Sequence, residues 1–358
     1  MRRSNKFYVS ICILLCLLCG MIGLSEAKKK KNAKYVWKMA TVAPDAAYLS
    51  EFLRDSLVTK FEKVTNNEVT VDMYWGGIMG DEEDYITKMR IGQLHGCVLS
   101  VGGVLMACPE MGVLQLPFLF NNYAEIAYIR KKLGKRFNDI YRKNGYKLIG
   151  WGDQDFDQIY STKYEMKTAE EFRKCRFLTH AGLLEQELIK ALGGSPIPVG
   201  VPEVVPSVRA GVCDTAISPA LWWLGSQLYT ITKYVNAYPF RYSPATLVVA
   251  IKSWDALPKK HRNAINKELP QLEKNLNKKI HEINRKCLKA MIDYGVKEVK
   301  MNNEEIEYIK KKTKPMWDKL AGKLYPKKLL DEILYHLKIY RSKYAKKDKD
   351  QGLSYWEL

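Results

Sequence analysis

The chain has 358 residues, of which 47% are hydrophobic, and a formal net charge of +19 at pH 7. This length and apolar content suffice for two domains or one large one, and they exclude a disordered or fibrous protein. The excess of Lys and Arg could indicate nucleic acid or an anionic lipid surface as a partner. Many lysines, however, lie in the last hundred residues at helical spacing with Glu between them, which favours a solvated face, and we expect no nucleic acid.

The first 27 residues have the pattern of a secretory signal peptide. A cationic start precedes an apolar run from Val9 to Leu24, and the sequence Ser25-Glu26-Ala27 is a small-x-small cleavage pattern. No later segment reaches the roughly 18 apolar residues that a membrane-spanning helix needs. We therefore expect an exported, periplasmic protein.

The eight cysteines form two groups. Three lie within the signal, and a lipid-anchored start at Cys19 stays open as an alternative, although bulky Leu18 precedes it where lipoprotein signals usually have a small residue. The other five are widely spaced and odd in number, so we expect small buried hydrophobic residues rather than disulfides. They are Cys97, Cys108, Cys175, Cys213 and Cys287.

Strand and helix patterns alternate along most of the chain. The first half predicts strands at 35–43, 68–75 and 96–100 and helices at 46–64, 81–94 and 122–145. The second half predicts strands at 146–152, 156–163, 174–179 and 213–218, helices at 183–192 and 202–211, and a connector at 193–199. Such alternation indicates an α/β sheet with right-handed crossovers, arranged as two lobes.

From Trp254 onward the pattern becomes helical. One apolar stripe marks a long helix that ends at Gly295 and that we expect to lie across both lobes: Leu272, Leu276, Ile280, Ile283, Cys287 and Met291. Two further helices are predicted at about 304–320 and 326–344. The charged stretch that follows is expected to be mobile.

A catalytic site finds little support. The sequence has no G-x-S-x-G elbow, H-E-x-x-H, C-x-x-C or phosphate loop, and its five histidines lie far apart. An exported hydrolase on an α/β scaffold is the enzymatic alternative, but no nucleophile and base form a candidate pair. We expect no enzyme, no metal and no cofactor.

Two short stretches could contact a ligand. The acidic run from Gly80 to Asp84 precedes a predicted helix, where carboxylates stabilise the positive end, so capping is the plainer interpretation and ligand contact by Asp81 the alternative. Trp222 and Trp223 follow a strand, at the edge where open α/β sheets bind ligands. We expect one indole in the core, whereas the other either lines a cleft or packs elsewhere.

Several stretches together resemble the DctP family, the solute-binding subunits of tripartite ATP-independent periplasmic (TRAP) transporters. They are "WGGIMGDEEDYITKMRIGQLHGCVLS", "VLQLPFLFNNYAEI", "YKLIGWGDQDFDQIYSTK" and the block from "AEEFRKCRFLT" to "VCDTAIS", in family order between Trp37 and Tyr325. The resemblance implies a two-lobed α/β periplasmic binding protein with a long helix spanning both lobes. It also implies capture of a small ligand between the lobes and its delivery to membrane subunits driven by an ion gradient.

The resemblance also supplies domain boundaries. We assign 35–153 with about 239–282 to lobe I, and 154–238 with about 283–325 to lobe II. The remaining residues, 326–358, form a C-terminal helix and a charged tail.

Against the family pattern, this chain differs at four positions that are usually or often polar. Leu178 takes the place of the arginine that usually binds a ligand carboxylate, and Asp157 that of a second cation in some members. Val101 stands where some members have an acid, and Ser218 where asparagine is frequent. Arg176 cannot substitute for the missing arginine, because it lies two residues, about 6–7 Å, further back along the strand.

The resemblance and these changes predict a hydrophobic or uncharged ligand. A carboxylate facing Leu178 and Asp157 would lose a contact worth about 1.5–3 kcal/mol, whereas an apolar lining stabilises by about 25 cal/mol per Å² removed from water. Asp157 would accept from an amine or hydroxyl. The expected ligand-binding residues are Tyr48, Trp75, Asp81, Val101, Asp157, Leu178, Ser218, Trp222, Tyr238 and Phe240.

Two alternatives stay open. Leu178 could belong to the core while Arg209 or Arg241 binds a family-typical organic acid. Alternatively, the cleft could be vestigial and the protein an adaptor that docks a partner through its basic C-terminal helices. Besides the TRAP membrane subunits, a helical-repeat lipoprotein of the tetratricopeptide type is a possible partner.

Overall fold

The computed structural model describes residues 33–45, 48–180 and 182–350, with side chains for all of these except 48, 49 and 345–350. The predicted signal peptide, a lipid anchor at Cys19 and the end of the charged tail lie outside the described residues. Within the described part, no helix combines the length and apolar character needed to cross a membrane.

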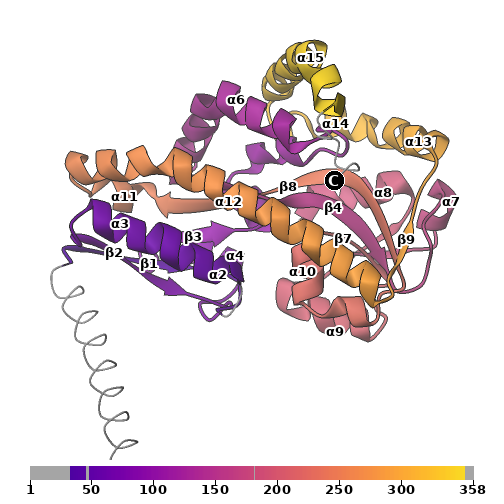
Figure 1. Ribbon diagram of the computed structural model, residues 1–358, viewed down its shortest axis with the longest axis horizontal. Coiled ribbons are helices and arrows are strands. Elements are labelled where there is room, and N and C mark those ends of the chain that lie inside the picture. Colours follow the sequence, from indigo (N-terminus) through magenta and orange to yellow (C-terminus); the bar gives the residue numbers. More distant parts are fainter. Residues whose placement is uncertain (1–32, 46–47, 181, 351–358) are drawn as a thin grey trace, which may run out of the picture.

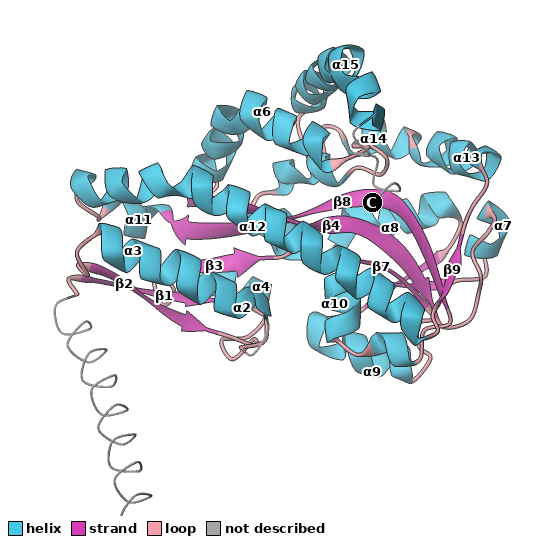
Figure 2. Ribbon diagram, in the orientation of Figure 1, coloured by secondary structure: helices cyan, strands magenta, loops and turns pink. Residues whose placement is uncertain are grey.

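Nine strands of the described residues form one sheet with the order β2-β1-β3-β8-β4-β7-β5-β6, and β9 pairs with β8 (Figure 2). Their bounds are β1 (Tyr35–Ala40), β2 (Val69–Tyr74), β3 (Gly96–Leu99), β4 (Tyr146–Ser161), β5 (Arg176–Thr179), β6 (Ser195–Pro198), β7 (Thr215–Ser218), β8 (Tyr234–Ala250) and β9 (Lys297–Val299). The outer strands pair in parallel, whereas β8 runs antiparallel to β3 and β4, and β4 also runs antiparallel to β7.

The two lobes share the long strands β4 and β8. At one end β3 pairs with β8, and at the other β7 pairs with β4. The sequence predicted two strands at 146–152 and 156–163, but β4 runs unbroken across them. Its pairing with β8 continues past irregular residues through three register shifts, which follow Leu148, Asp153 and Asp157. Strand β6 replaces the expected connector, since an edge strand tolerates its prolines.

Helices cover the sheet on both faces (Figure 1). The helical segments are α2 (Tyr48–Leu53), the π-helix η1 (Arg54–Val58), α3 (Thr59–Val64), α4 (Glu82–Arg90), α5 (Val101–Ala107), η2 (Pro109–Gln115), α6 (Tyr123–Lys143), α7 (Ala169–Phe172), α8 (Gly182–Leu192), η3 (Val201–Glu203), α9 (Val204–Arg209), α10 (Ala220–Gly225), η4 (Leu228–Thr230), α11 (Ile251–Asp255), α12 (Lys259–Tyr294), α13 (Asn303–Thr313), α14 (Pro315–Leu320) and α15 (Lys327–Asp350).

The predicted long helix is α12, which crosses both lobes (Figure 1). Its 36 residues extend for about 54 Å. The N-terminal half buries Leu272 against the β1 and β2 side of the sheet, and the C-terminal half buries Cys287 and Met291 under lobe II. Gly295 ends the helix with φ of 126°, a conformation that favours glycine. The predicted long helix across both lobes and its predicted end at Gly295 are both confirmed.

The core has three clusters of buried side chains. The largest lies between the sheet and helices α4, α5, α6, α8 and α15, and two smaller clusters lie beneath α12, one in each lobe. Helix α15 packs beside α6, where Arg341 Nε donates to Glu125 Oε1 at 2.7 Å. The five cysteines predicted to be buried and unpaired are confirmed as such.

Candidate functional site

The strands β4 and β8 bring residues of both lobes together midway along the sheet. On the lobe I side, the backbone N–H of Val101 at the start of α5 donates to Gln154 Oε1 on β4 at 3.2 Å. Glu82 is buried at the start of α4 and accepts from Ser100 Oγ at 2.7 Å and from the backbone N–H of Gly103 at 3.1 Å. These contacts place the start of α5 against β4 and hold the start of α4 to that of α5.

A buried ion-pair cluster lies on the lobe II side. Arg241 on β8 stands opposite Asp157 on β4, and its Nε lies 2.6 Å from Asp157 Oδ2. Its Nη2 lies 2.6 Å from Glu185 Oε1 on α8. Ser243 donates to Asp157 at 2.5 Å, and the backbone N–H of His180 donates to Glu185 Oε2 at 2.9 Å. One buried cation is thus shared between two buried carboxylates.

The charges of this cluster keep the Arg241 guanidinium ionised and paired with two protein carboxylates. Burial raises the pKa of Asp157, and Arg241 and Ser243 only partly oppose that rise. Burial alone would lower the pKa of Arg241, but Glu185 and Asp157 outweigh it and raise the pKa instead. Arg241 therefore stays charged, and the carboxylates of Asp157 and Glu185 compensate its charge.

Four buried polar atoms near this cluster have no hydrogen-bond partner within the described residues: Arg241 Nη1, Asp157 Oδ1, Thr179 Oγ1 and His180 Nδ1. Thr179 ends β5, and His180 follows it directly. Across the lobes, burial raises the pKa of Glu82, while Ser100 and the nearby His180 act in the opposite direction. A ligand here would meet both donors and acceptors.

Asp155 adds another buried carboxyl between the lobes. Tyr123 OH, at the start of α6, donates to its Oδ1 at 2.8 Å, and the backbone N–H of Ala220, at the start of α10, donates to Oδ2 at 3.3 Å. Burial, with a smaller effect from the Asp157 charge, raises the pKa of Asp155 to about 7. Its ionisation therefore changes near neutral pH.

Leu178 lies in the core of lobe II. It is 2% exposed, pairs across from Ala216, and belongs to the apolar cluster that contains Tyr160 and Trp223. Its side chain therefore points into the layer between the sheet and helices α9, α10 and α12. The interpretation that assigns Leu178 to the core fits these contacts.

The other candidate cations differ in position. Arg176 is half-exposed and donates to Asp214 and to the carbonyl of Gly211. Arg209 donates to the carbonyl of Gln227 in an exposed contact. Of these three arginines, only Arg241 is buried beside the shared strands.

The structure corrects the expectation that Tyr238, Phe240 and Leu178 line one apolar surface at the ligand. Between Asn236 and Arg241, β8 bulges out of register with β4. The bulge directs both rings onto Phe118, at centroid distances of 5.9 and 5.7 Å. Phe240 consequently belongs to the largest core cluster rather than to that of Leu178.

The two tryptophans separate as expected into a core and a less buried residue. Trp223 is buried and stacks on Tyr160 at 4.9 Å. Trp222 is half-buried and lies parallel to the His180 ring at 6.4 Å. Trp222 therefore lies beside the ring that carries the unpartnered Nδ1 of His180.

Asp81 caps α4, as the plainer interpretation predicted, in a capping box with Asp84. Trp75 is buried under the Arg54 guanidinium at 4.9 Å. Ser218 is also buried, at the end of β7. The side chain of Tyr48, at the start of α2, lies outside the described part.

The sequence patterns did not single out Glu82 within the acidic run from Gly80 to Asp84, missed Glu185, and did not pair Arg241 with Asp157. The paired residues are 84 positions apart, so no local spacing indicates their contact. The exchange of a cation for an acid at Asp157 was the available signal, because a buried carboxylate requires a cation nearby.

The architecture defines a two-lobed solute-binding protein. Residues 39–323 match the model of family 7 of the bacterial extracellular solute-binding proteins, DctP. The chain belongs to this family, whose members are the solute-binding subunits of TRAP transporters and are not enzymes.

Individual proteins resemble it distantly. A solute-binding protein of Chromohalobacter salexigens is 22% identical over 90% of this chain and 95% of its own. The crystal structure of a TRAP periplasmic solute-binding protein from that organism, with bound D-glucuronate, has a TM-score of 0.77 at 22% identity, covering 84% of this chain and 98% of its own. That of a sugar-acid-binding protein of Advenella mimigardefordensis with galactonate has a TM-score of 0.79 at 19% identity, covering 86% and 99%.

Proposed function

We propose that this chain captures a small uncharged solute between its lobes and delivers it to the ion-gradient-driven membrane subunits of a TRAP transporter. The solute would have hydroxyl groups for the buried donors and acceptors and an apolar face for the half-buried Trp222. This refines the hydrophobic or uncharged ligand expected from the sequence.

The observation that carries the proposal is the balance of charge around Arg241. Its guanidinium contacts Asp157 and Glu185 at 2.6 Å each, so a ligand carboxylate would have to compete with two carboxylates already in place. Burying another unpaired anion beside them costs several kcal/mol, on the order of 3–5 for a broken buried pair. A hydroxyl has no such cost, since it can donate to Asp157 Oδ1 and accept from Arg241 Nη1.

A second candidate is an organic acid held by Arg241 Nη1. The unpartnered Nη1 favours it, and two proteins of similar fold were crystallised with D-glucuronate and galactonate. In this alternative Arg241 would bind one ligand carboxylate in addition to its two protein partners.

Galactonate and galactitol separate the two candidates, because they differ chiefly in a carboxylate against a hydroxymethyl group. We would titrate both calorimetrically into the mature protein, after identifying any co-purified solute by native mass spectrometry. The proposal expects an uncharged co-purified solute and no galactonate binding. A co-purified organic acid, or galactonate binding tighter than galactitol, would favour the second candidate.

Asp157→Asn gives a sharper test of the charge balance. The change removes one competing charge at nearly constant shape, so galactonate, which the unchanged protein should not bind detectably, should bind measurably to the variant, at least about tenfold above the detection limit, equivalent to about 1.4 kcal/mol. Asp255→Asn, at a partly exposed ion pair with Arg142, is the matched control and should change nothing. Equal galactonate affinity in all three proteins would contradict the assigned role of Asp157.

Leu178→Arg tests the strand position that the family usually fills with arginine. In the apolar surroundings of Tyr160 and Trp223 a cation lacks partners, so we expect a destabilised protein without acid affinity. A stable variant that binds galactonate would place Leu178 at the ligand. The adaptor alternative and the helical-repeat lipoprotein stay predictions.

A further inference from the structure

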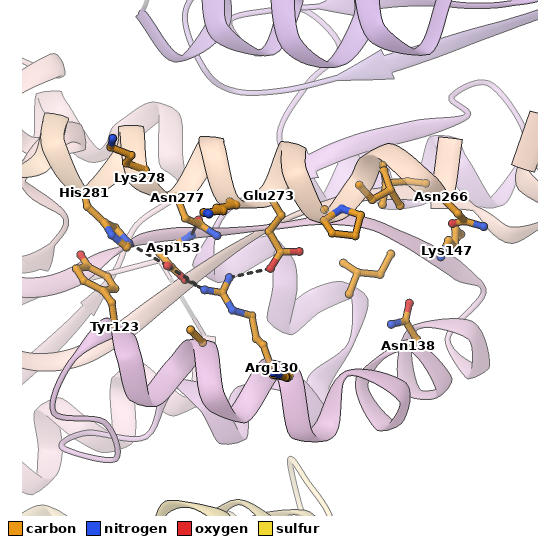
Figure 3. A pocket seen from close by; sticks show the side chains of 18 residues that line it. Tyr123, Arg130, Asn138, Lys147, Asp153, Asn266, Glu273, Asn277, Lys278 and His281 are labelled. Atoms are coloured by element: carbon orange, nitrogen blue, oxygen red, sulfur yellow. Dashed lines mark hydrogen bonds and ion pairs between the residues drawn. The ribbon is translucent and has the colours of Figure 1, made fainter. Parts of the chain in front are cut away.

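A groove of about 820 Å³ runs between α6 and α12 (Figure 3), and Arg241, Asp157 and Glu185 are not among the residues that line it. Its walls extend from Tyr123 to Asn138 on α6 and from Asn266 to His281 on α12, and its floor is the first half of β4. Each wall covers 15 helical steps, or about 22 Å. That length matches six or seven residues of extended chain rather than one small solute.

Cations dominate this groove. Five Lys and Arg side chains line it against two carboxylates. Arg130 bridges the walls, with Nη2 at 3.0 Å from Asp153 and Nη1 at 3.4 Å from Glu273 (Figure 3). The remaining four are Lys131, Lys147, Lys274 and Lys278, and none of them forms an ion pair with any residue that the structure describes. The unneutralised charge favours an anionic occupant.

The floor of the groove is a sheet edge. From Tyr146 to Asp157, β4 pairs with β8 alone, and β7 begins to pair only at Gln158. Asn277 covers part of this edge, because its side chain accepts from the backbone N–H of Asp153 at 2.7 Å and donates to the carbonyl of Trp151 at 3.1 Å.

Closer to the start of β4, Lys147 and Leu148 are half-buried and Ile149 and Gly150 are buried, but the described side chains leave the backbone polar groups unbonded. No described side chain forms a hydrogen bond with the backbone of Lys147–Gly150. A sheet edge can accept an added strand through main-chain hydrogen bonds. Lys147, which lies on that edge, is half-buried, and burial followed by the charge of Arg142 lowers its pKa.

We propose that this groove is a docking site for an acidic, extended segment of a partner protein, which adds along the edge of β4 between α6 and α12. The lysines supply charge complementarity and the edge supplies main-chain pairing. The same lysines oppose pairing with a second copy of this chain, whose net charge is +19. The inference is independent of the solute between the lobes.

The test uses the mature protein and a fluorescein-labelled peptide, Glu-Val-Glu-Val-Glu-Val, with anisotropy measured at low and at physiological salt. We expect saturable binding that weakens with salt. The variant Lys274→Glu/Lys278→Glu should bind at least ten times more weakly. Lys267→Glu/Lys286→Glu is the matched control, because it changes the same net charge on exposed positions of α12 that do not line the groove.

Two further probes distinguish the possible occupants. Glu-Pro-Glu-Pro-Glu-Pro has the same charge but fewer backbone donors, so weaker binding than the valine peptide supports strand addition. Equal binding of the two peptides, equal losses in the two variants, or no binding at all would overturn the proposal. Displacement of the peptide by citrate at a similar concentration would also overturn it, by making the groove a site for small anions.

Discussion

The buried Arg241 cluster and the groove between α6 and α12 hold opposite balances of charge. In the cluster one cation meets two carboxylates out of contact with water, whereas five cations and two carboxylates line the groove, where Asp153 is buried but Lys274 and Lys278 are exposed. A chain of net charge +19 is thus acidic where it would enclose a solute and basic where it could receive a partner. Net charge alone does not locate an anion-binding site.

The largest expected effect comes from removing the cation of the cluster. Arg241→Met leaves Asp157 and Glu185 buried without compensation, and we expect a loss of about 3–5 kcal/mol in the free energy of unfolding, measured by urea denaturation. The triple variant Arg241→Met/Asp157→Asn/Glu185→Gln should recover much of that loss, because no unpaired charge remains. A loss below about 1 kcal/mol in the single variant would contradict the burial of this ion pair.

The equivalent change in the groove should cost less. Arg130→Met removes a partner of Asp153 and Glu273, but Tyr242 OH still donates to Asp153 at 2.6 Å and His281 lies 2.9 Å from it. Glu273 is also one-third exposed. We expect a loss of about 1–3 kcal/mol by the same urea measurement, and a loss as large as that of Arg241→Met would remove the contrast between the two regions.

A pH dependence should follow from Asp155. Its pKa of about 7 in the folded protein lies above the ordinary value of 3.8, so the folded state holds the proton more tightly. The associated stability is present below pH 4 and is lost as the pH rises to 7. As the pH rises from 5 to 7, the free energy of unfolding of Asp155→Asn should increase by roughly 2 kcal/mol relative to that of the unchanged protein. If the free energies of unfolding of the two proteins instead change in parallel between pH 5 and pH 7, Asp155 is already ionised in the folded protein across this range.

The smallest effect is expected at the rim of the groove. Lys274 and Lys278 are exposed and form no ion pair with a described residue. Replacing both with Gln should therefore change the free energy of unfolding by no more than about 0.5 kcal/mol. A clear loss of stability in thermal or urea unfolding would mean that these lysines support the fold rather than remaining available to a partner.

Local patterns predicted the elements better than their contacts. The stripe from Leu272 to Met291 and the terminating Gly295 identified α12, since both signals lie within one helix. The division of β4 failed because its polar residues Asp153 and Asp155 resemble a loop, yet side chains distant in sequence satisfy them. Asn277 and Tyr123 provide such contacts.

The candidate site was less predictable for the same reason. The aligned position of Leu178 indicated an altered ligand site, but only the fold shows that Asp157 meets Arg241 and Glu185. The lysines of α12 were interpreted as a solvated face. Their alignment with Lys131 and Lys147 depends on how α6, α12 and β4 pack together, which helical spacing alone cannot predict.

The two lobes are joined by continuous strands, and this has a mechanical consequence. A movement of one lobe against the other would twist and bend the ribbon formed by β4 and β8, without first breaking a row of hydrogen bonds. The register shifts after Leu148, Asp153 and Asp157 lie on that ribbon, and a strand bends and twists more strongly at such bulges. Bending of β4 and β8 would therefore store elastic energy, and its release would return the lobes to their original arrangement.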